Sequence, residues 1–551
     1  MQEFQANAGQ AKQVVIIGGG PSGLTAGYEL TAAEIPVTVL EKHAIVGGIA
    51  RTESYKGFLF DMGGHRFFSK SEVVNNFWDK LLADRFLVRP RQSRIYYRGK
   101  FFDYPLRAVN AFRNLGLIET CLIMLSCLRW KAFPHKQEKT FEQWVTNRFG
   151  RRLYKIFFES YTEKVWGISC SELSADWAAQ RIKGLSLKTA VLTALGKKDK
   201  GIKTLIESFK YPEKGPGMMW EEVASRITSN EGELCLNANV TGIHRVGNKI
   251  LSIESGGSDS QGCCVNVGTH FISSMPLSEL VLKMDPPAPE KVRFAADQLC
   301  YRDFLTVCLI VDIPHVFSDN WIYIHDSNVK VGRVQNYKNW SPEMVPEEGQ
   351  SSLGLEYFCN EGDSIWNMPD DELVELAKQE MKSLGLLEIE DVIDGCVFRV
   401  EKSYPVYDST YKEHLQVLRE FVEDFENLQT IGRNGLHRYN NQDHAMLTGI
   451  IAAGNIINDA QNDVWAVNED KQYHEEISRE GLRSEPQATD ATSSVMSPRA
   501  AELSQGEAEL SQGEAECTSD SQESVLVVPS LGSELSRLAN LSANAASHNR
   551  D

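Results

Sequence analysis

A glycine-rich turn between an apolar strand and a helix is the feature that most constrains this fold. Residues 14–17, Val-Val-Ile-Ile, are apolar without alternation, as in a strand buried on both faces of a parallel sheet. Gly18, Gly20 and Gly23 follow in the spacing G-x-G-x-x-G, and a helix is predicted over residues 24–31. The first glycine permits a tight turn, the second lets the backbone approach a pyrophosphate, and the third lets the helix pack on its strand.

A second apolar segment completes the unit. Residues 37–40 are predicted to form a parallel strand, and Glu41 follows directly. An acidic residue at this position accepts hydrogen bonds from a ribose hydroxyl, and the helix after the glycines directs its free N–H groups at the phosphates. Strand, helix, strand and acid in this order predict a dinucleotide-binding domain.

Composition limits the functions that remain. The net charge of −18 and the pI of about 5.3 argue against wholesale binding of nucleic acid or anionic membranes. The 11 cysteines are scattered without a C-x-x-C pair, which favours reduced thiols and a cytoplasmic protein, and no metal-binding cluster is recognised. The most apolar run, residues 115–130, contains Glu119 and is too short for a transmembrane segment. We expect it to be an amphipathic core helix, with a membrane-surface helix as the alternative.

Two further glycine pairs follow the first unit. Gly47 and Gly48 precede Arg51, a pattern that suits a loop passing close to a cofactor and offering a cation to its phosphates. Gly64 is the second glycine of a pair that leads into His65, which could face the cofactor or simply pack in the core. Together with the first motif, this series resembles the FAD family that includes flavin amine oxidases, protoporphyrinogen oxidases and UDP-galactopyranose mutases. The resemblance implies FAD, rather than NAD, as the cofactor.

A narrower resemblance is carried by five separated motifs, and it covers about residues 12–460. They are similar to those of the eukaryotic-type UDP-galactopyranose mutases. The motifs are Tyr104-Pro105, the segment from Tyr161 to Trp166 with the Trp177-x-x-x-Arg181 helix, the strand with Tyr323 followed by Arg333, the Ser403-Tyr404-Pro405 segment, and the Gly432–His444 segment.

The mutase resemblance implies interconversion of UDP-galactopyranose and UDP-galactofuranose with FAD kept reduced. In that mechanism the flavin nitrogen N5 is the nucleophile, UDP leaves, the sugar ring recloses through another hydroxyl, and UDP returns. The protein positions the sugar, stabilises the leaving diphosphate and excludes water.

Site residues are implied by the same resemblance. Arg181 and Arg333 stand at the two diphosphate-arginine positions, and His65 is placed with them as a catalytic candidate. Tyr104, Tyr323, Tyr404, Tyr439 and Asn441 match the substrate-facing positions, Tyr104 at the uracil. The cofactor-binding candidates are Gly18, Gly20, Gly23, Glu41, Gly47, Gly48, Arg51, Gly64, His65, Arg433, Asn441, Gln442 and Asp443.

The sequence also departs from the mutase pattern, so other functions stay open. Leu106-Arg107 replaces the Phe-Gln that follows Tyr-Pro in those enzymes, and Tyr439 and Asn441 are two residues closer together. Another nucleotide-sugar or another acidic substrate could therefore occupy the site. One alternative is an oxidoreductase of the amine oxidase or protoporphyrinogen oxidase type, and another is a non-catalytic flavoprotein. A reductant such as NAD(P)H or a reductase would have to dock transiently, and the oligomeric state is not predicted.

The predicted fold class is α/β, with a Rossmann-like FAD-binding domain (GR2-type) interleaved with a mixed helical and antiparallel-sheet substrate domain. The FAD-binding domain is expected in three parts, and the substrate domain in two. An acidic, low-complexity remainder is expected to be a disordered tail. The expected boundaries are 12–90, 211–299 and 416–474 for the FAD-binding domain, 91–210 and 300–415 for the substrate domain, and 475–551 for the tail.

Overall fold

The first sheet is parallel and is built from segments far apart in the chain. In the computed structural model, which describes residues 11–175, 204–205, 207–256, 264–468 and 476–477, it has five strands. Its order is β10 (Glu233–Cys235), β2 (Val37–Leu40), β1 (Val14–Ile17), β14 (His270–Ser273) and β21 (Leu428–Thr430), and every neighbouring pair is parallel. The continuous apolar run predicted to form the central strand is β1, which is buried along its whole length.

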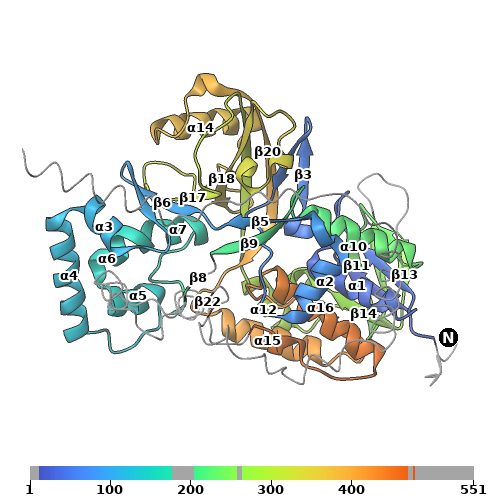
Figure 1. Cartoon of the computed structure of the whole chain (residues 1–551). Helices are drawn as coiled ribbons and strands as arrows, with labels where there is room; N and C mark the ends of the chain where they lie inside the picture. Colours follow the sequence, from blue (N-terminus) through green and yellow to red (C-terminus); the bar gives the residue numbers. More distant parts are fainter. Residues whose placement is uncertain (1–10, 176–203, 206, 257–263, 469–475, 478–551) are drawn as a thin grey trace, which may run out of the picture. The chain divides into compact units, whose positions relative to one another are not determined.

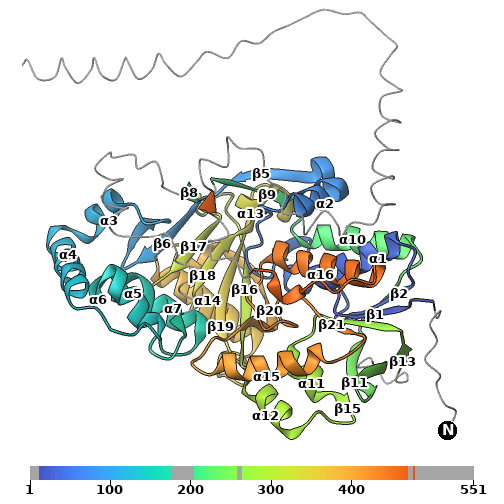
Figure 2. The ribbon, with the colours of Figure 1, turned by 90° about the horizontal axis from the view of Figure 1, so that it is seen from below.

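Helices cover one face of this sheet and a smaller sheet lies on the other. The helix α1 (Pro21–Ala32) packs between α10 (Gly217–Ser229) and α16 (Gln442–Ile457), and Figure 2 shows these three helices together beside β1 and β2. The smaller sheet has the order β13 (Cys264–Val267), β12 (Lys249–Gly256), β11 (Asn239–Val246), β15 (Met284–Asp285). Its inward residues Val240, Ile243, Ile250 and Ile253 join one apolar core with β1 and β14.

The second large sheet has seven strands, which are antiparallel except for one pair. Its order is β20 (Val392–Pro405), β16 (Tyr301–Val311), β19 (Ser351–Cys359), β18 (Arg333–Asn336), β17 (Trp321–Ile324), β6 (Ser93–Tyr97) and β7 (Lys100–Asp103), with β17 and β6 parallel. Helix α14 (Asp370–Ser383) packs on it with Leu373, Ala377 and Met381 fully buried. The predicted α/β class, with parallel and antiparallel sheets interleaved along the chain, is confirmed.

A helical lobe is inserted between β7 and β9. It consists of α3 (Ala108–Leu115), α4 (Leu117–Ala132), α5 (Phe141–Phe149), α6 (Arg151–Tyr154), a π-helical turn at Lys155–Glu159, and α7 (Ser160–Trp166), seen in the blue-green part of Figure 1. Its core is aromatic, with Phe141, Tyr154 and Trp166 almost fully buried. The remaining elements connect these layers: β3 (Thr52–Tyr55), β4 (Phe58–Asp61), α2 (Glu72–Leu82), β5 (Phe86–Pro90), β8 (Thr204–Leu205), β9 (Ser208–Pro212), α11 (Leu277–Leu282), α12 (Glu290–Gln298), α13 (Tyr337–Trp340), α15 (Tyr411–Glu423) and β22 (Glu476–Ile477).

The apolar run at 115–130 is not the core helix that its composition predicts. It forms the end of α3 and most of α4, and only Ile123 and Cys127 of α4 are buried. Among the described helices, none is long and apolar enough to cross a membrane alone. The segments Val109–Leu115 and Leu117–Ala132 pass such a test only as a pair, and they are bent by 117°. The expectation was wrong because an apolar stripe at helical spacing does not reveal whether protein or solvent lies against it.

Candidate functional site

A cavity of about 240 Å³ opens where the carboxyl ends of β1 and β2 meet β20 and the start of α16. Carboxyl ends of parallel strands are the usual binding edge of such sheets. The first amino-terminal turns of two helices, α1 and α16, contribute residues to its wall, so their free N–H groups can face a bound anion.

The glycines at the base of this cavity have distinct geometries. Gly18 has φ of +101°, and a Cβ there would lie 2.2 Å from Oγ of Ser274. A Cβ on Gly23 would lie 2.0 Å from the carbonyl oxygen of Gly18, so α1 packs directly on the turn. Gly20 lines the cavity and faces Gly48, whose added Cβ would lie 3.2 Å from Cα of Gly20. Two glycine loops therefore form a smooth floor that side chains would block.

Glu41 lies at the end of β2 with its carboxylate turned back toward the glycine turn. It accepts hydrogen bonds from the backbone N–H of Gly19 at 2.7 Å and of His43 at 3.0 Å. Burial raises the pKa of Glu41, and these two hydrogen bonds oppose that rise. Arg51 is also buried, and it donates to the carbonyl of Gly48 at 3.0 Å and to Glu53 at 2.6 Å.

The start of α16 supplies polar groups at the opposite side of the cavity. Arg433 donates to the carbonyl of Asn440 at 2.9 Å, which fixes its guanidinium beside the helix. Nε2 of Gln442 and Oδ1 of Asn434 are buried without a hydrogen-bond partner among the described residues, and both residues line the cavity. Such buried polar atoms are expected where a polar cofactor completes the hydrogen bonding. Asp443 does not line the cavity, and it accepts a hydrogen bond from Ser69 at 2.8 Å.

His65 lies at the cavity wall as an uncharged group. Its Nε2 is 3.0 Å from the carbonyl oxygen of Met62, so the Nε2–H tautomer donates there. Burial, together with the nearby guanidinium groups of Arg433 and Arg333, lowers the pKa of His65 to about 4. His65 is therefore neutral near pH 7.

Arg333 is held by a carboxylate in the neighbouring strand. Its Nε donates to Oε1 of Glu356 at 2.8 Å and its Nη2 donates to Oε2, while Gln335 donates to the same carboxylate at 2.6 Å. Glu356 is fully buried. Within the described part of the chain Nη1 of Arg333 makes no hydrogen bond, so this group is free to bind an anion. Burial opposes the charge of Arg333, but Glu356 and the neighbouring tyrosines raise its pKa overall.

The predicted substrate tyrosines form two aromatic contacts near Arg333. Tyr404 and Tyr439 stack with centroids 5.5 Å apart, and Arg433 lies over both rings. Tyr323 contacts Tyr104 at 5.0 Å and Tyr161 at 5.5 Å. Burial raises the pKa of Tyr404 and of Tyr161, so both stay protonated and can donate.

Not every predicted site residue reaches the cavity. Nine of the predicted residues line the cavity: Gly18, Gly20, Glu41, Gly48, Arg51, His65, Arg433, Asn441 and Gln442. The predicted residues that do not line it are Gly23, Gly47, Gly64, Asp443, Arg333 and the four tyrosines. Gly64 packs on the ring of Trp340. Arg181 lies outside the described residues, as do residues 478–551 of the predicted tail.

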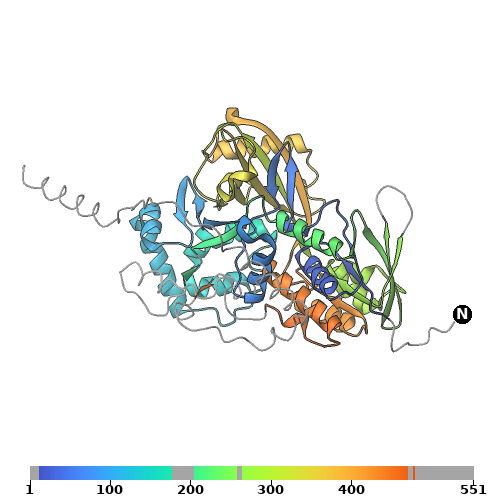
Figure 3. The same cartoon turned by 45° about the vertical axis from the view of Figure 1, so that its right-hand side comes forward.

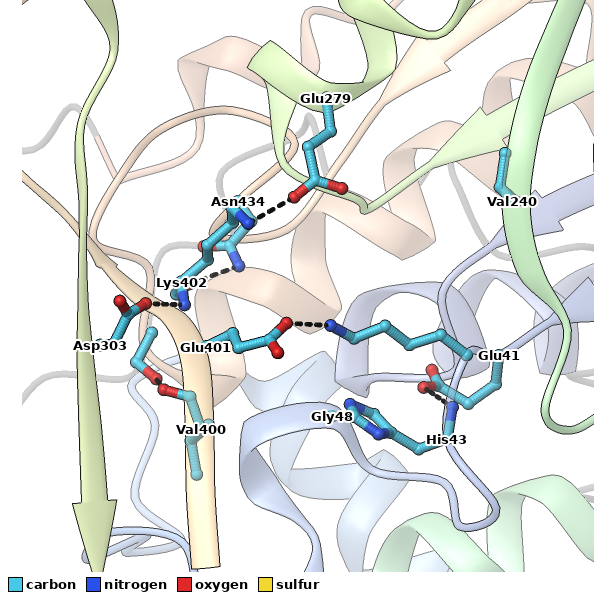
Figure 4. Close-up of polar contacts among 12 residues, drawn as sticks. Glu41, His43, Gly48, Val240, Glu279, Asp303, Val400, Glu401, Lys402 and Asn434 are labelled. Carbon is cyan, nitrogen blue, oxygen red and sulfur yellow. Dashed lines mark hydrogen bonds and ion pairs between the residues drawn. The ribbon is translucent and has the colours of Figure 1, made fainter. Parts of the chain in front are cut away.

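Sequence reasoning missed the charged residues that surround the site. Lys42 forms an ion pair with Glu401 at 3.0 Å. Figure 4 shows Asp303 accepting a hydrogen bond from the backbone N–H of Lys402. The Lys402 ammonium pairs with Glu279 at 2.7 Å. Glu356 carries the one signal that could have been noticed, a lone carboxylate inside the apolar strand Ser351–Cys359. In the described ranges no three His, Cys, Asp or Glu side chains are grouped to hold a metal ion.

Comparison with known proteins agrees with this architecture. The family described as flavin containing amine oxidoreductase matches residues 21–457. A probable UDP-galactopyranose mutase of Klebsiella pneumoniae is 26% identical over 176 residues, which is 30% of this chain and 43% of that protein. A dTDP-fucopyranose mutase of Escherichia coli is 27% identical over 168 residues, covering 30% of this chain and 44% of that protein. These matches span less than half the length of either relative.

Solved structures extend the likeness over the described fold. A crystal structure of reduced UDP-galactopyranose mutase superimposes with a TM-score of 0.71 at 23% identity, covering 84% of this chain and 99% of that one. A putative protoporphyrinogen oxidase from Exiguobacterium gives 0.62 at 17% identity, covering 82% and 100%. At these identities the structures establish the shared fold.

Proposed function

This chain belongs to the flavin containing amine oxidoreductase family and is an FAD-dependent enzyme, and we propose that it interconverts the pyranose and furanose forms of a UDP-sugar. The observation that carries the proposal is Arg333, whose Nη1 is free while Glu356 holds its other two nitrogens. An oriented guanidinium is suited to a diphosphate, which it binds with permanent charge and directional hydrogen bonds.

The cavity residues fit FAD. The floor formed by Gly20 and Gly48 admits a pyrophosphate, Glu41 is suited to a ribose hydroxyl, and Gln442 and Asn434 present unsatisfied polar atoms. When bound and reduced, FAD supplies a nucleophilic ring nitrogen for attack on the anomeric carbon.

The protein residues would act on the substrate and its leaving group. Arg333 would hold the diphosphate as negative charge develops on it, and Arg181 is proposed as the second cation. Because Glu356 neutralises much of the charge of Arg333, a second cation is needed to balance a departing dianion. The rings of Tyr404 and Tyr439 are stacked, and burial raises the pKa of Tyr404 and keeps its hydroxyl protonated. Both tyrosines would donate hydrogen bonds to the sugar and phosphate oxygens.

His65 would serve as a positioning group. Since its pKa is lowered to about 4, it carries no positive charge to compete with the arginines for the diphosphate. Its ring is fixed by the carbonyl of Met62 at the cavity wall, and a Cβ on Gly63 would lie 3.7 Å from its Nε2 and 3.9 Å from Nη2 of Arg333.

The test compares dithionite-reduced with oxidised enzyme, using UDP-galactopyranose and chromatographic detection of the furanose. We expect turnover only after reduction and no consumption of oxygen. The Arg333→Lys variant should lose about 100-fold in kcat/KM, because lysine cannot reproduce the fork, while its FAD content stays unchanged. Arg94→Lys is a matched control, because Arg94 also pairs with a buried carboxylate, Asp319, but lies in β6 away from the cavity.

Two results would contradict the proposal. Turnover by the oxidised enzyme with peroxide formation from an amine or porphyrin would identify an oxidoreductase. Stoichiometric FAD binding without furanose formation from UDP-galactose or other UDP-hexoses would leave a flavoprotein of another function.

A further inference from the structure

A second cavity, outside the cofactor site, has four cationic side chains among its ten lining residues. It measures about 510 Å³ and lies between the hairpin β6–β7, the end of α3, the start of α4, and the segment 152–156. Arg98, Lys100, Arg152 and Lys155 line it, and Glu119 is the carboxylate among its lining residues. This excess of positive charge contrasts with the net charge of −18 of the whole chain.

Two of these cations donate no hydrogen bond within the described ranges, although Arg98 lies over the ring of Tyr97. Arg152 pairs with Glu119, and Lys100 donates to the carbonyl of Asn114 at 2.6 Å. Arg98 and Lys155 make neither a hydrogen bond nor a hydrogen-bonded ion pair with any part of the chain that the structure describes, and both are exposed. A cavity with four cations and one carboxylate is suited to an anion such as a phosphate group.

The helices beside this cavity expose an apolar face. Leu117, Ile118, Leu122, Leu125 and Leu128 recur at helical spacing along α4, and Ile118 is 80% exposed. Val109 and Phe112 of α3, and Met124 and Phe133 at α4, extend the exposed face. Contiguous exposed apolar surface of this kind marks an interaction site.

The inner face of α4 is firmly attached to the protein, so the exposed face is not a fraying end. Ile123 and Cys127 are buried, and a Cβ on Gly150 would lie 2.7 Å from the backbone nitrogen of Cys127. Figures 1 and 3 show α4 at the edge of the helical lobe, with α5 and α6 on its inner side and, among the described residues, no other helix on its outer side.

Basic residues border this apolar face at both ends. Residues 107–136 contain five Lys or Arg side chains and one carboxylate, Glu119. Arg107 and Arg113 lie at the α3 end, and Arg129, Lys131 and Lys136 at the other, all of them exposed. Trp130, beside them, is half-buried and stacks on His135. Apolar side chains flanked by Lys, Arg and Trp are typical of helices that lie in a membrane interface.

We propose that the α3–α4 face docks on a bilayer containing anionic phospholipid, with a lipid phosphate in the cavity lined by Arg98 and Lys155. A second copy of the chain fits this face less well. A two-fold contact would bring the same basic borders together, and like charges across an interface are unfavourable. The proposal is independent of the reaction catalysed in the cofactor site.

The test is co-sedimentation of the FAD-loaded full-length protein with vesicles. We expect binding to phosphatidylcholine vesicles containing about one third phosphatidylglycerol, weakening steeply with added salt, and little binding to phosphatidylcholine alone. The double variant Arg98→Gln/Lys155→Gln should weaken binding at least about tenfold, and so should Ile118→Gln/Leu125→Gln. Val265→Gln/Val267→Gln is the matched control, because these exposed apolar residues lie on β13.

Several outcomes would overturn the proposal. They are absence of vesicle binding by the unmodified protein, equal binding to neutral and anionic vesicles, and binding unchanged by both double variants. Light scattering that finds a dimer, dissociated by Ile118→Gln/Leu125→Gln, would assign the face to a second copy instead. FAD content and circular dichroism of each variant establish that the fold is retained.

Discussion

Two glycines of one motif serve different ends. A Cβ on Gly23 would lie 2.0 Å from a backbone oxygen, a distance that no small adjustment relieves. A Cβ on Gly20 would lie 3.7 Å from its nearest neighbour in the chain, which is ordinary contact. The space beside Gly20 is thus left open for the cofactor, whereas the space beside Gly23 is already filled by protein.

We therefore predict that substitution by alanine affects a different property at each position, FAD affinity at Gly20 and the stability of the apoprotein at Gly23. Gly20→Ala should weaken FAD binding by at least about tenfold while the apoprotein keeps its stability, because the methyl group occupies the pyrophosphate path. Gly23→Ala should lower the free energy of unfolding of the apoprotein by about 3 kcal/mol, because α1 must move off its strand. Fluorescence titration of FAD and urea unfolding of both apoproteins measure the two effects. Equal loss of stability in both variants would contradict this division.

The contact between α7 and β17 joins the helical lobe to the seven-stranded sheet. His325, directly after β17, stacks on Tyr161 of α7 with centroids 4.8 Å apart and planes within 8°. Burial, together with the nearby charge of Lys164, lowers the pKa of His325 to about 3. Lys164 itself donates to the carbonyls of Ile324 and Val331, at 3.4 and 3.2 Å.

Because His325 is buried in this contact between α7 and β17, the free energy of unfolding should fall in acid. An unfolded His325 takes up a proton near its ordinary pKa of 6.5, and the folded one only near pH 3. Its contribution to stability is therefore complete above pH 6.5 and is lost as pH falls toward 3. His325→Phe keeps the stacking but cannot titrate. Relative to the unmodified protein, the free energy of unfolding of the His325→Phe variant should rise by about 1.4 kcal/mol for each pH unit below pH 6.5.

Urea unfolding at about pH 7 and about pH 5.5 measures this difference. The control is His315→Phe at an exposed position, which should follow the unmodified protein at both pH values. A constant difference between His325→Phe and the unmodified protein would show that His325 does not titrate during unfolding.

The sequence predicts individual helices and strands, but it does not predict which side chains on neighbouring strands contact each other. The strands at 14–17 and 37–40 and the helix predicted at 24–31 could be read from apolar runs and turns, because each is set by its own residues. The partner of Arg333 could not, because Glu356 meets it through the register of β18 with β19, 23 residues along the chain. The exposure of α4 was missed for a related reason, since it depends on which elements pack beside the helix.

In the whole molecule, the cofactor cavity is where the two large sheets meet. Gly18 and Glu41 come from the parallel sheet, while Val400 and Glu401 come from β20 at the edge of the antiparallel one. Two ion pairs in the described part of the chain cross this junction, the half-exposed pairs Lys42–Glu401 and Glu279–Lys402. Exposed pairs of this kind contribute at most about 1 kcal/mol each.

Bound FAD should therefore join the two sheets more strongly than the protein's own ion pairs do. With free FAD at about 100 times its dissociation constant, the free energy of unfolding should rise by about 2.7 kcal/mol over the apoprotein. Glu401→Gln removes the pair with Lys42 and should cost less than about 1 kcal/mol in either state. Calorimetry of the apoprotein and the FAD-loaded protein, each with and without the substitution, measures both the stabilisation by FAD and the cost of Glu401→Gln. If FAD left the unfolding midpoint unchanged, the cavity at the junction of the sheets would not be the cofactor site. If Glu401→Gln cost more than FAD contributes, the ion pair and not FAD would be the stronger link between the sheets.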